Sequence, residues 1–195
     1  MSRSGKTKER MLASTVTLLC EHGTRGTSID AVLAHGGAHR GSLYHHFPGG
    51  RAELVGTAVR QAGDYIGSLF EAVADRGDIR TGLQLFVRFW KQALIDSDYQ
   101  ARCPIVALAV DGHNHIHDST EMVAEIFARW HHTCTGLLEQ HGYDPARPQR
   151  LATLTVAAVK SAVIRCRAQR SSEPREAVVT ELLAIVDPRA ENGRD

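Results

Sequence analysis

Hydrophobic residues recur every three to four positions along most of this chain, and the strict alternation that marks a β-strand is nearly absent. The first such pattern carries Leu12, Val16 and Leu19 on one side, follows a charged segment and ends at Gly23. Later segments repeat this spacing over different lengths. The sequence therefore predicts an all-α fold.

Two short helical patterns follow, separated by a pair of glycines. The first starts at Thr27, which we expect to cap the helix, with Asp30 three residues later completing a capping-box-like pair. It ends at the glycine pair that begins with Gly36. The second covers residues 39–47 and ends before Pro48, because proline cannot continue a helix.

Longer helical patterns fill the remainder of the chain. They are expected over residues 51–77, 83–94, 104–110, 122–138, 147–169 and 174–186. The segment 104–110 is apolar on all sides, which predicts burial. The last two helices each keep an apolar face, and nothing later in the chain covers the final one, so we expect a partner subunit. The polar tail from Pro188 is expected to be disordered.

Composition narrows the class of protein. With 195 residues, 43% of them hydrophobic, the chain can bury a core without disulfides or metal. Its longest apolar stretch is far shorter than the roughly 20 residues that cross a bilayer, and no apolar signal segment follows the basic N-terminus. Cysteines stand singly among apolar neighbours, at Cys20, Cys103, Cys134 and Cys166. This spacing favours reduced thiols and a cytoplasmic protein.

Charge is distributed unevenly although the net charge is only +1. Residues up to Arg60 carry eight Lys or Arg against four acids, whereas the remainder has 15 basic and 18 acidic residues. A basic first third is expected where one end of a protein meets a polyanion. Lys6, Lys8 and Arg10 are expected to form a flexible basic arm that touches the DNA backbone.

Short helix, glycine turn and short helix form the outline of a DNA-reading module. The second short helix has small or polar residues in its N-terminal half, which base edges and phosphates require. These residues are His39, Arg40, Gly41, Ser42, Tyr44 and His45. Leu43 and Phe47, four positions apart, give the helix one apolar face that can anchor it. The alternative is that the polar residues simply cover the surface of a small helical bundle.

The motif Thr27-Ser28-Ile29, followed by Arg-Gly-Ser-Leu-Tyr-His-His-Phe-Pro-Gly-Gly at residues 40–50, resembles the DNA-binding domain of TetR-family transcriptional regulators. Within that family it is similar to the LmrA-like branch of lincomycin- and multidrug-resistance repressors. The segment Arg-Cys-Pro-Ile-Val-Ala at residues 102–107 also resembles that branch. The similarity is looser in the C-terminal part of the chain.

The resemblance implies roles for single residues in DNA binding. Thr27 corresponds to a capping residue that also touches phosphate, and Arg51 to a phosphate-binding lysine. Arg40 and Ser42 correspond to positions that face bases, and Tyr44 and His45 to contacts with phosphates or bases. Two residues depart from the family pattern: His39 stands where proline, serine or threonine is usual and can add a DNA contact, and Gly36 replaces the alanine of the turn.

The resemblance also implies an organisation for the whole chain. Residues 1–50 would form the helix-turn-helix domain, residues 51–187 a helical domain for ligand binding and dimerisation, and residues 188–195 a disordered tail. A homodimer places two recognition helices roughly 34–36 Å apart, which matches successive major grooves and implies a palindromic operator. A small-molecule effector would then control DNA binding.

Aromatic residues of the second domain are candidates for the effector pocket, together with one histidine. They are Tyr65, Phe86, Phe89, Trp90, Trp130 and His113. Apolar and aromatic walls are typical of small-molecule sites, but each of these aromatic side chains fits a plain core as well or better.

The sequence of residues 111–118 alternates His113, His115 and His117 with other residues, and imidazoles are ligands for zinc. A polar loop explains the segment better, an effector contact is second and a metal site is third. No motif for a nucleophilic serine, a zinc protease or a dinucleotide is present, and we expect neither enzyme activity nor a cofactor.

These observations favour a ligand-responsive DNA-binding regulator, a repressor released from its operator by the effector. The alternative is a helical protein that binds a small molecule or a metal and has no operator recognition.

Overall fold

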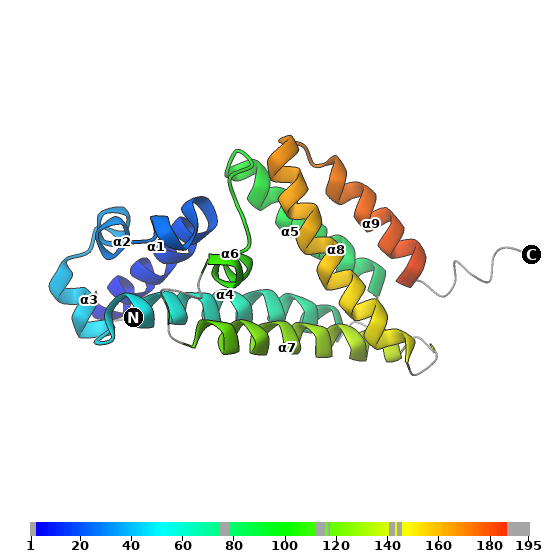
Figure 1. The fold of residues 1–195 in the computed structure, drawn as a ribbon, viewed down its shortest axis with the longest axis horizontal. Helices are drawn as coiled ribbons and strands as arrows, with labels where there is room; N and C mark the ends of the chain where they lie inside the picture. Colours follow the sequence, from blue (N-terminus) through cyan, green and yellow to red (C-terminus); the bar gives the residue numbers. More distant parts are fainter. Residues whose placement is uncertain are drawn as a thin grey trace, which may run out of the picture. The chain divides into compact units, whose positions relative to one another are not determined.

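The computed structural model describes residues 3–74, 79–111, 116, 118–140, 143 and 146–186. This part of the chain is helical, without strands, as predicted (Figure 1). The helices are α1 (Arg3–Gly26), α2 (Ile29–Gly36), α3 (Arg40–His46), α4 (Gly50–Ala74), α5 (Ile79–Asp96), α6 (Pro104–Asp111), α7 (Ser119–Glu139), α8 (Arg147–Gln169) and α9 (Glu173–Val186). None of the described helices is both long and apolar enough to cross a membrane.

The chain divides into two compact units. Unit 1 comprises Met1–Asp64 and Arg102–Ile126, and unit 2 comprises Tyr65–Ala101 and Phe127–Asp195. Helices α4 and α7 each contribute to both units, and α6 belongs to unit 1. The predicted boundary after residue 50 separates a DNA-binding part from a ligand-binding part, whereas the two units are separated by compactness. The predicted boundary stays a prediction.

The core of unit 1 joins α1, α2, α3 and the start of α4. Leu43 of α3 and Phe47, the C-cap residue directly after it, point inward, with 0% and 1% of their surface exposed. They pack in one cluster with Met11 of α1, Val32 of α2 and Leu54 of α4. Because a seven-residue helix has little stability of its own, this apolar anchor holds α3 in place.

Glycines define where the helices of this module bend or end. Gly23 has φ 69° and interrupts α1, as the sequence predicts, although one more helical turn follows to Gly26. Gly37 adopts a left-handed φ of 57° and caps α2, its N–H donating to the carbonyl of Leu33. The predicted N-cap is wrong: Ser28, not Thr27, caps α2, because the Ser28 hydroxyl accepts a hydrogen bond from the N–H of Ala31.

Helix α6 packs against the end of α1 within unit 1. Arg102, just before α6, donates from its backbone N–H and from Nε to the carbonyl of Cys20, both at 3.1 Å, and from Nη2 to the carbonyl of Glu21 at 2.9 Å. Ile105 and Leu108 of α6 are fully buried, as predicted. Val110 is 75% exposed, so the predicted burial of the whole segment is wrong at its last turn, where the helix leaves the core.

Unit 2 is built around α5, α8 and α9. Helices α8 and α9 run antiparallel and side by side, joined by a short turn, and α5 packs against both (Figure 1). Arg170 ends α8 in a left-handed conformation with φ 48° and pairs with Asp98 at 2.7 Å. The four cysteines of the chain are free thiols, as predicted, and three of them are buried.

Candidate nucleic-acid interface and effector site

Helix α3 exposes the polar residues that the sequence predicts to meet DNA. His39 occupies the N-cap position without a side-chain cap, and Arg40, Tyr44 and His45 are exposed, Tyr44 by 47%. Ser42 is half-buried. Leu43 on the same helix faces the core, so the polar residues form an outer face on a fixed support.

Arg40 forms an ion pair with Asp30 of α2, which joins the two short helices across the turn. Both side chains are largely exposed, 59% for Arg40 and 78% for Asp30. An exposed pair of this kind contributes about 0–1 kcal/mol. The guanidinium can therefore exchange Asp30 for a phosphate or a base edge at little cost.

Arg51, in the first turn of α4, uses two of its nitrogens inside the protein. Its Nε donates to the carbonyl of Thr27 at 2.8 Å, and its Nη2 donates to the carbonyl of Thr24. The side chain is half-buried and ties the start of α4 to the last turn of α1 and to the segment between α1 and α2. Only Nη1 is left outside these two bonds.

Thr27 is 1% exposed, and its hydroxyl donates to the carbonyl of Gly23 at 2.8 Å. Ser28 is the exposed hydroxyl residue at the start of α2. Sequence reasoning missed Ser28, although a serine directly before the apolar Ile29 is a helix-start signal in its own right. The sequence leaves the choice open because two hydroxyl residues stand in succession.

The basic N-terminal segment is part of α1, so the expected flexible arm is wrong for Lys6, Lys8 and Arg10. Lys8 places its ammonium 5.6 Å from the ring centre of Phe47. The hydroxyl of Ser4 lies 3.3 Å from Nε2 of His46. These contacts join the first turns of α1 to the end of α3.

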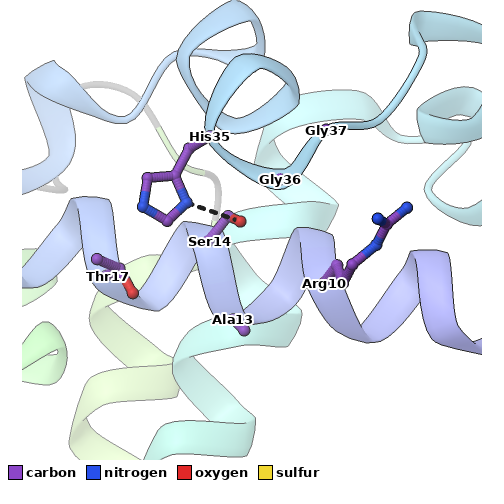
Figure 2. Close-up of a pocket in the computed structure, with 7 residues that line it drawn as sticks. All are labelled: Arg10, Ala13, Ser14, Thr17, His35, Gly36 and Gly37. Atoms are coloured by element: carbon purple, nitrogen blue, oxygen red, sulfur yellow. Dashed lines mark hydrogen bonds between the residues drawn. The ribbon is translucent and has the colours of Figure 1, made fainter.

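An open groove of about 460 Å³ lies between α1 and the end of α2. Figure 2 shows the ring of His35 directed at Ser14, with Nδ1 at 3.0 Å from the Ser14 hydroxyl oxygen. A Cβ at Gly36 would lie 2.9 Å from that oxygen. This close approach gives a physical reason for glycine where the resembling family has alanine.

Four of the six predicted effector residues lie close together in unit 2. Trp90 and Trp130, with 3% and 2% of their surface exposed, both contact the ammonium of Lys160, whose Nζ lies 5.1 Å and 4.4 Å from their ring centres. Phe89 stacks edge-on with Trp90 at 5.5 Å and with Tyr65 at 5.9 Å. Tyr65 is 55% exposed, so the cluster runs from the interior to the surface.

Lys160 is the residue of this cluster that sequence reasoning missed. It lies on α8 in line with the buried Val163, three positions later, and is itself only 9% exposed. A lysine within an apolar helical stripe is a visible signal, but its aromatic partners come from distant segments. The pair of indoles stabilises the ammonium through cation–π contacts.

The remaining predicted effector and metal positions lie outside what the structure describes. His113, His115 and His117 fall outside the described residues, as does the side chain of Phe86. The described residues contain no group of three His, Cys, Asp or Glu placed to hold a metal ion.

The first helices and the second part of the chain match two models of one family. Residues 11–57 match "Bacterial regulatory proteins, tetR family", and residues 80–181 match "Transcriptional regulator LmrA/YxaF-like, C-terminal domain". The chain belongs to the TetR family of transcriptional regulators. This confirms the resemblance to the LmrA-like branch and the predicted class of function, because regulators of the family are DNA-binding and typically ligand-responsive repressors.

Individual relatives agree with this membership. An HTH-type transcriptional regulator of Mycobacterium tuberculosis is 32% identical over 184 residues, covering 90% of this chain and 91% of the relative. LmrA of Bacillus subtilis is 25% identical and covers 87% of this chain and 91% of its own. The crystal structure of a TetR regulator from Legionella pneumophila superimposes with a TM-score of 0.82 at 20% identity, covering 93% of this chain and 96% of that one.

Proposed function

We propose that this TetR-family regulator is a homodimeric repressor that a small-molecule effector releases from a palindromic operator. The observation that carries the proposal is the polar outer face of α3, which is held on a rigid apolar core by Leu43 and Phe47. The proposed role is regulatory and not enzymatic, and its place is the cytoplasm, where the operator DNA is.

The DNA contacts are proposed for the residues of the α3 face and its supports. Arg40 leaves Asp30 and donates its two-pronged guanidinium to a guanine edge or a phosphate, the strongest geometry open to it. Further contacts come from shorter side chains of α3 and its N-cap, namely His39, Ser42, Tyr44 and His45. Arg51 and Thr27, whose side chains serve internal bonds, contribute mainly by fixing the α2 start, and Arg51 adds a phosphate contact through Nη1.

The proposed dimer uses the outer face of α8 and α9. Leu154 and Ile164 on α8 are 47% and 55% exposed, and Ala157 and Ser161 lie between them on the same exposed side. Ile185 on α9 is 37% exposed. A stripe of apolar and small residues at helical spacing fits the packing of one helix pair against its copy.

The effector is proposed to bind at the aromatic cluster of unit 2, in the domain formed by residues 51–187. Tyr65, Phe89, Trp90 and Trp130 supply its walls, and Phe86 and His113 stay predicted contributors. Binding has to favour the DNA-free conformation by a few kcal/mol to move the regulator from mostly bound to mostly free. The alternative is a small-molecule or metal-binding protein without operator recognition.

Selection of duplexes from a random DNA pool tests the proposal, using the purified full chain at near-physiological salt, where phosphate contacts alone retain little DNA. An enriched palindrome is the expected result, with an Arg40→Ala variant as control that loses the enrichment. Recovery of no common sequence would overturn operator recognition and favour the alternative.

A further inference from the structure

Arg175, in the first turn of α9, is the most deeply buried charged residue in the described part of the chain, with 1% of its surface exposed. Its Nε, Nη1 and Nη2 are all enclosed, and none makes a hydrogen bond. A guanidinium keeps its charge at any pH the protein meets and carries five N–H donors. The interior of unit 2 therefore holds a fixed cation whose donors are unsatisfied.

Glu176 is the carboxylate closest to pairing with Arg175, but it does not satisfy these donors. Its Oε1 lies 3.6 Å from Nη2 of Arg175, which is beyond hydrogen-bond distance. The same oxygen accepts from Ser172 at 2.8 Å and from Lys91 at 3.4 Å. Glu176 is half-exposed, and these three contacts lower the pKa of its carboxyl, the Ser172 bond most.

The position of Arg175 in the first turn of α9 is unfavourable for a second reason, besides burial of its charge. The N-terminal end of a helix carries a partial positive charge, which disfavours a cation in the first turn and favours an anion. The three nitrogens are already enclosed in the single chain, so a second subunit docking on the surface does not reach them. An acceptor for Arg175 has to enter unit 2 itself.

A second buried cation lies in the same unit. Lys160 of α8 contacts Trp90 of α5, and the next residue of α5, Lys91, pairs with Glu176 beside Arg175. The same turn of α5 thus contacts Lys160 and the carboxylate beside Arg175. Among the described residues the buried charged side chains are Lys160 and Arg175, and no Asp or Glu is buried.

We propose that unit 2 binds an apolar monoanion, a carboxylate on an aliphatic or aromatic body, with the carboxylate held by the guanidinium of Arg175. Two parallel N–H···O bonds of this pair give two of the five enclosed N–H donors an acceptor. An apolar body is favoured because Val179, one turn along α9 from Arg175, is buried, as are apolar residues of α8 such as Val163. The inference rests on the proposed effector function and names the chemical class of the effector.

Thermal unfolding and calorimetric titration of the full-length protein test this site. The probes are benzoate and octanoate, each compared with its primary amide, which keeps the shape and lacks the charge. We expect both carboxylates to raise the unfolding temperature by several degrees and the amides to leave it unchanged. Arg175→Met should abolish the carboxylate effect, whereas Arg165→Met, which removes an exposed arginine from α8, should keep it.

The unfolding temperature in buffer without ligand is an independent measurement. Arg175→Met should unfold at a higher temperature than the parent, because methionine fills similar space without an unsatisfied charge. A lower unfolding temperature of this variant would contradict a net cost of the buried charge and would overturn the inference. Equal effects of carboxylates and amides on the parent, or an unchanged carboxylate effect in Arg175→Met, would overturn it as well.

Operator release separates this inference from the proposed function. Carboxylates that bind through Arg175 but leave the operator occupied would support the anion site and contradict its effector role. Release of the operator by another compound, without carboxylate binding, would support the regulator and overturn the anion site.

Discussion

The guanidinium of Arg51 donates a hydrogen bond from Nε to the backbone carbonyl of Thr27, 2.8 Å away and 24 positions earlier in the chain. A second bond from Nη2 reaches the carbonyl of Thr24. The carbonyl of Thr24 lies in the last turn of α1, and that of Thr27 lies between α1 and α2. Arg51 therefore sets the position of the α2 start relative to α4.

Replacing Arg51 by methionine should lower the free energy of unfolding by about 1–3 kcal/mol, because two carbonyl acceptors lose their partner. Operator affinity should fall as well, since the α2 start is no longer fixed. Urea unfolding and a DNA titration measure the two effects. Arg60→Met, at an exposed position of α4, is the matched control and should leave stability within about 0.5 kcal/mol. Equal stability of the two variants would contradict a stabilising role of the two Arg51 hydrogen bonds.

Arg40→Ala should weaken specific operator binding by about 1–3 kcal/mol, because a bidentate base contact is lost. Its effect on stability should stay below about 1 kcal/mol, since the Asp30 pair is exposed. Asp30→Asn should tighten DNA binding, because it frees Arg40 and removes a carboxylate near the phosphates. Gel-shift titrations at fixed salt measure both variants. Weaker binding by Asp30→Asn would argue that the ion pair orients Arg40 for DNA.

The effect of Gly36→Ala on the free energy of unfolding should depend strongly on Ser14, whose hydroxyl oxygen would lie 2.9 Å from the new Cβ. When Ser14 is present, its side chain has to rotate and lose its bond to His35. This loss offsets the gain of about 1 kcal/mol that alanine gives over glycine in a helix. In a Ser14→Ala background the gain should appear in full. A double-mutant cycle by chemical denaturation measures this coupling, and simple additivity would contradict it.

Ile164→Glu should convert the proposed dimer to a monomer, because it places a charge in the middle of the exposed apolar stripe of α8. Ile95→Glu on α5 is the matched control, since Ile95 is 49% exposed and Ile164 is 55% exposed. Sedimentation analysis gives the molecular mass of each variant. A dimeric Ile164→Glu protein would place the interface elsewhere.

Stability should fall as the pH rises from about 9 toward 12, through the partly buried thiol of Cys20 and the buried thiol of Cys134. Burial, with smaller effects of Cys103 and Glu21, raises the pKa of Cys20 to about 12, and burial raises the pKa of Cys134 to about 11. In the unfolded chain these thiols ionise near 9.0, so the stabilising effect of their neutral form is complete below that pH and is lost above it. Unfolding temperatures from pH 8 to 11 measure this, and Cys134→Ala should flatten the profile.

Much of the local structure follows from short stretches of sequence. The spacing of Leu43 and Phe47 predicts the inward face of α3, and the glycines at positions 23 and 37 predict the two helix breaks. Caps are less certain at this level, because Thr27 and Ser28 are adjacent and either hydroxyl can serve. The partner of Thr27, the carbonyl of Gly23, becomes visible only once α1 and α2 are in place.

The sequence by itself determined the helical class, the DNA-reading module and the family, since periodicity, glycine punctuation and one contiguous motif are local properties of the chain. Only the tertiary structure decided that Arg51 donates to backbone carbonyls, that Lys160 contacts two indoles and that Arg175 is enclosed with its donors unsatisfied. Each of these facts depends on segments far apart in sequence. Burial and pairing of a charge are decided by which helices pack together, and local spacing does not carry that information.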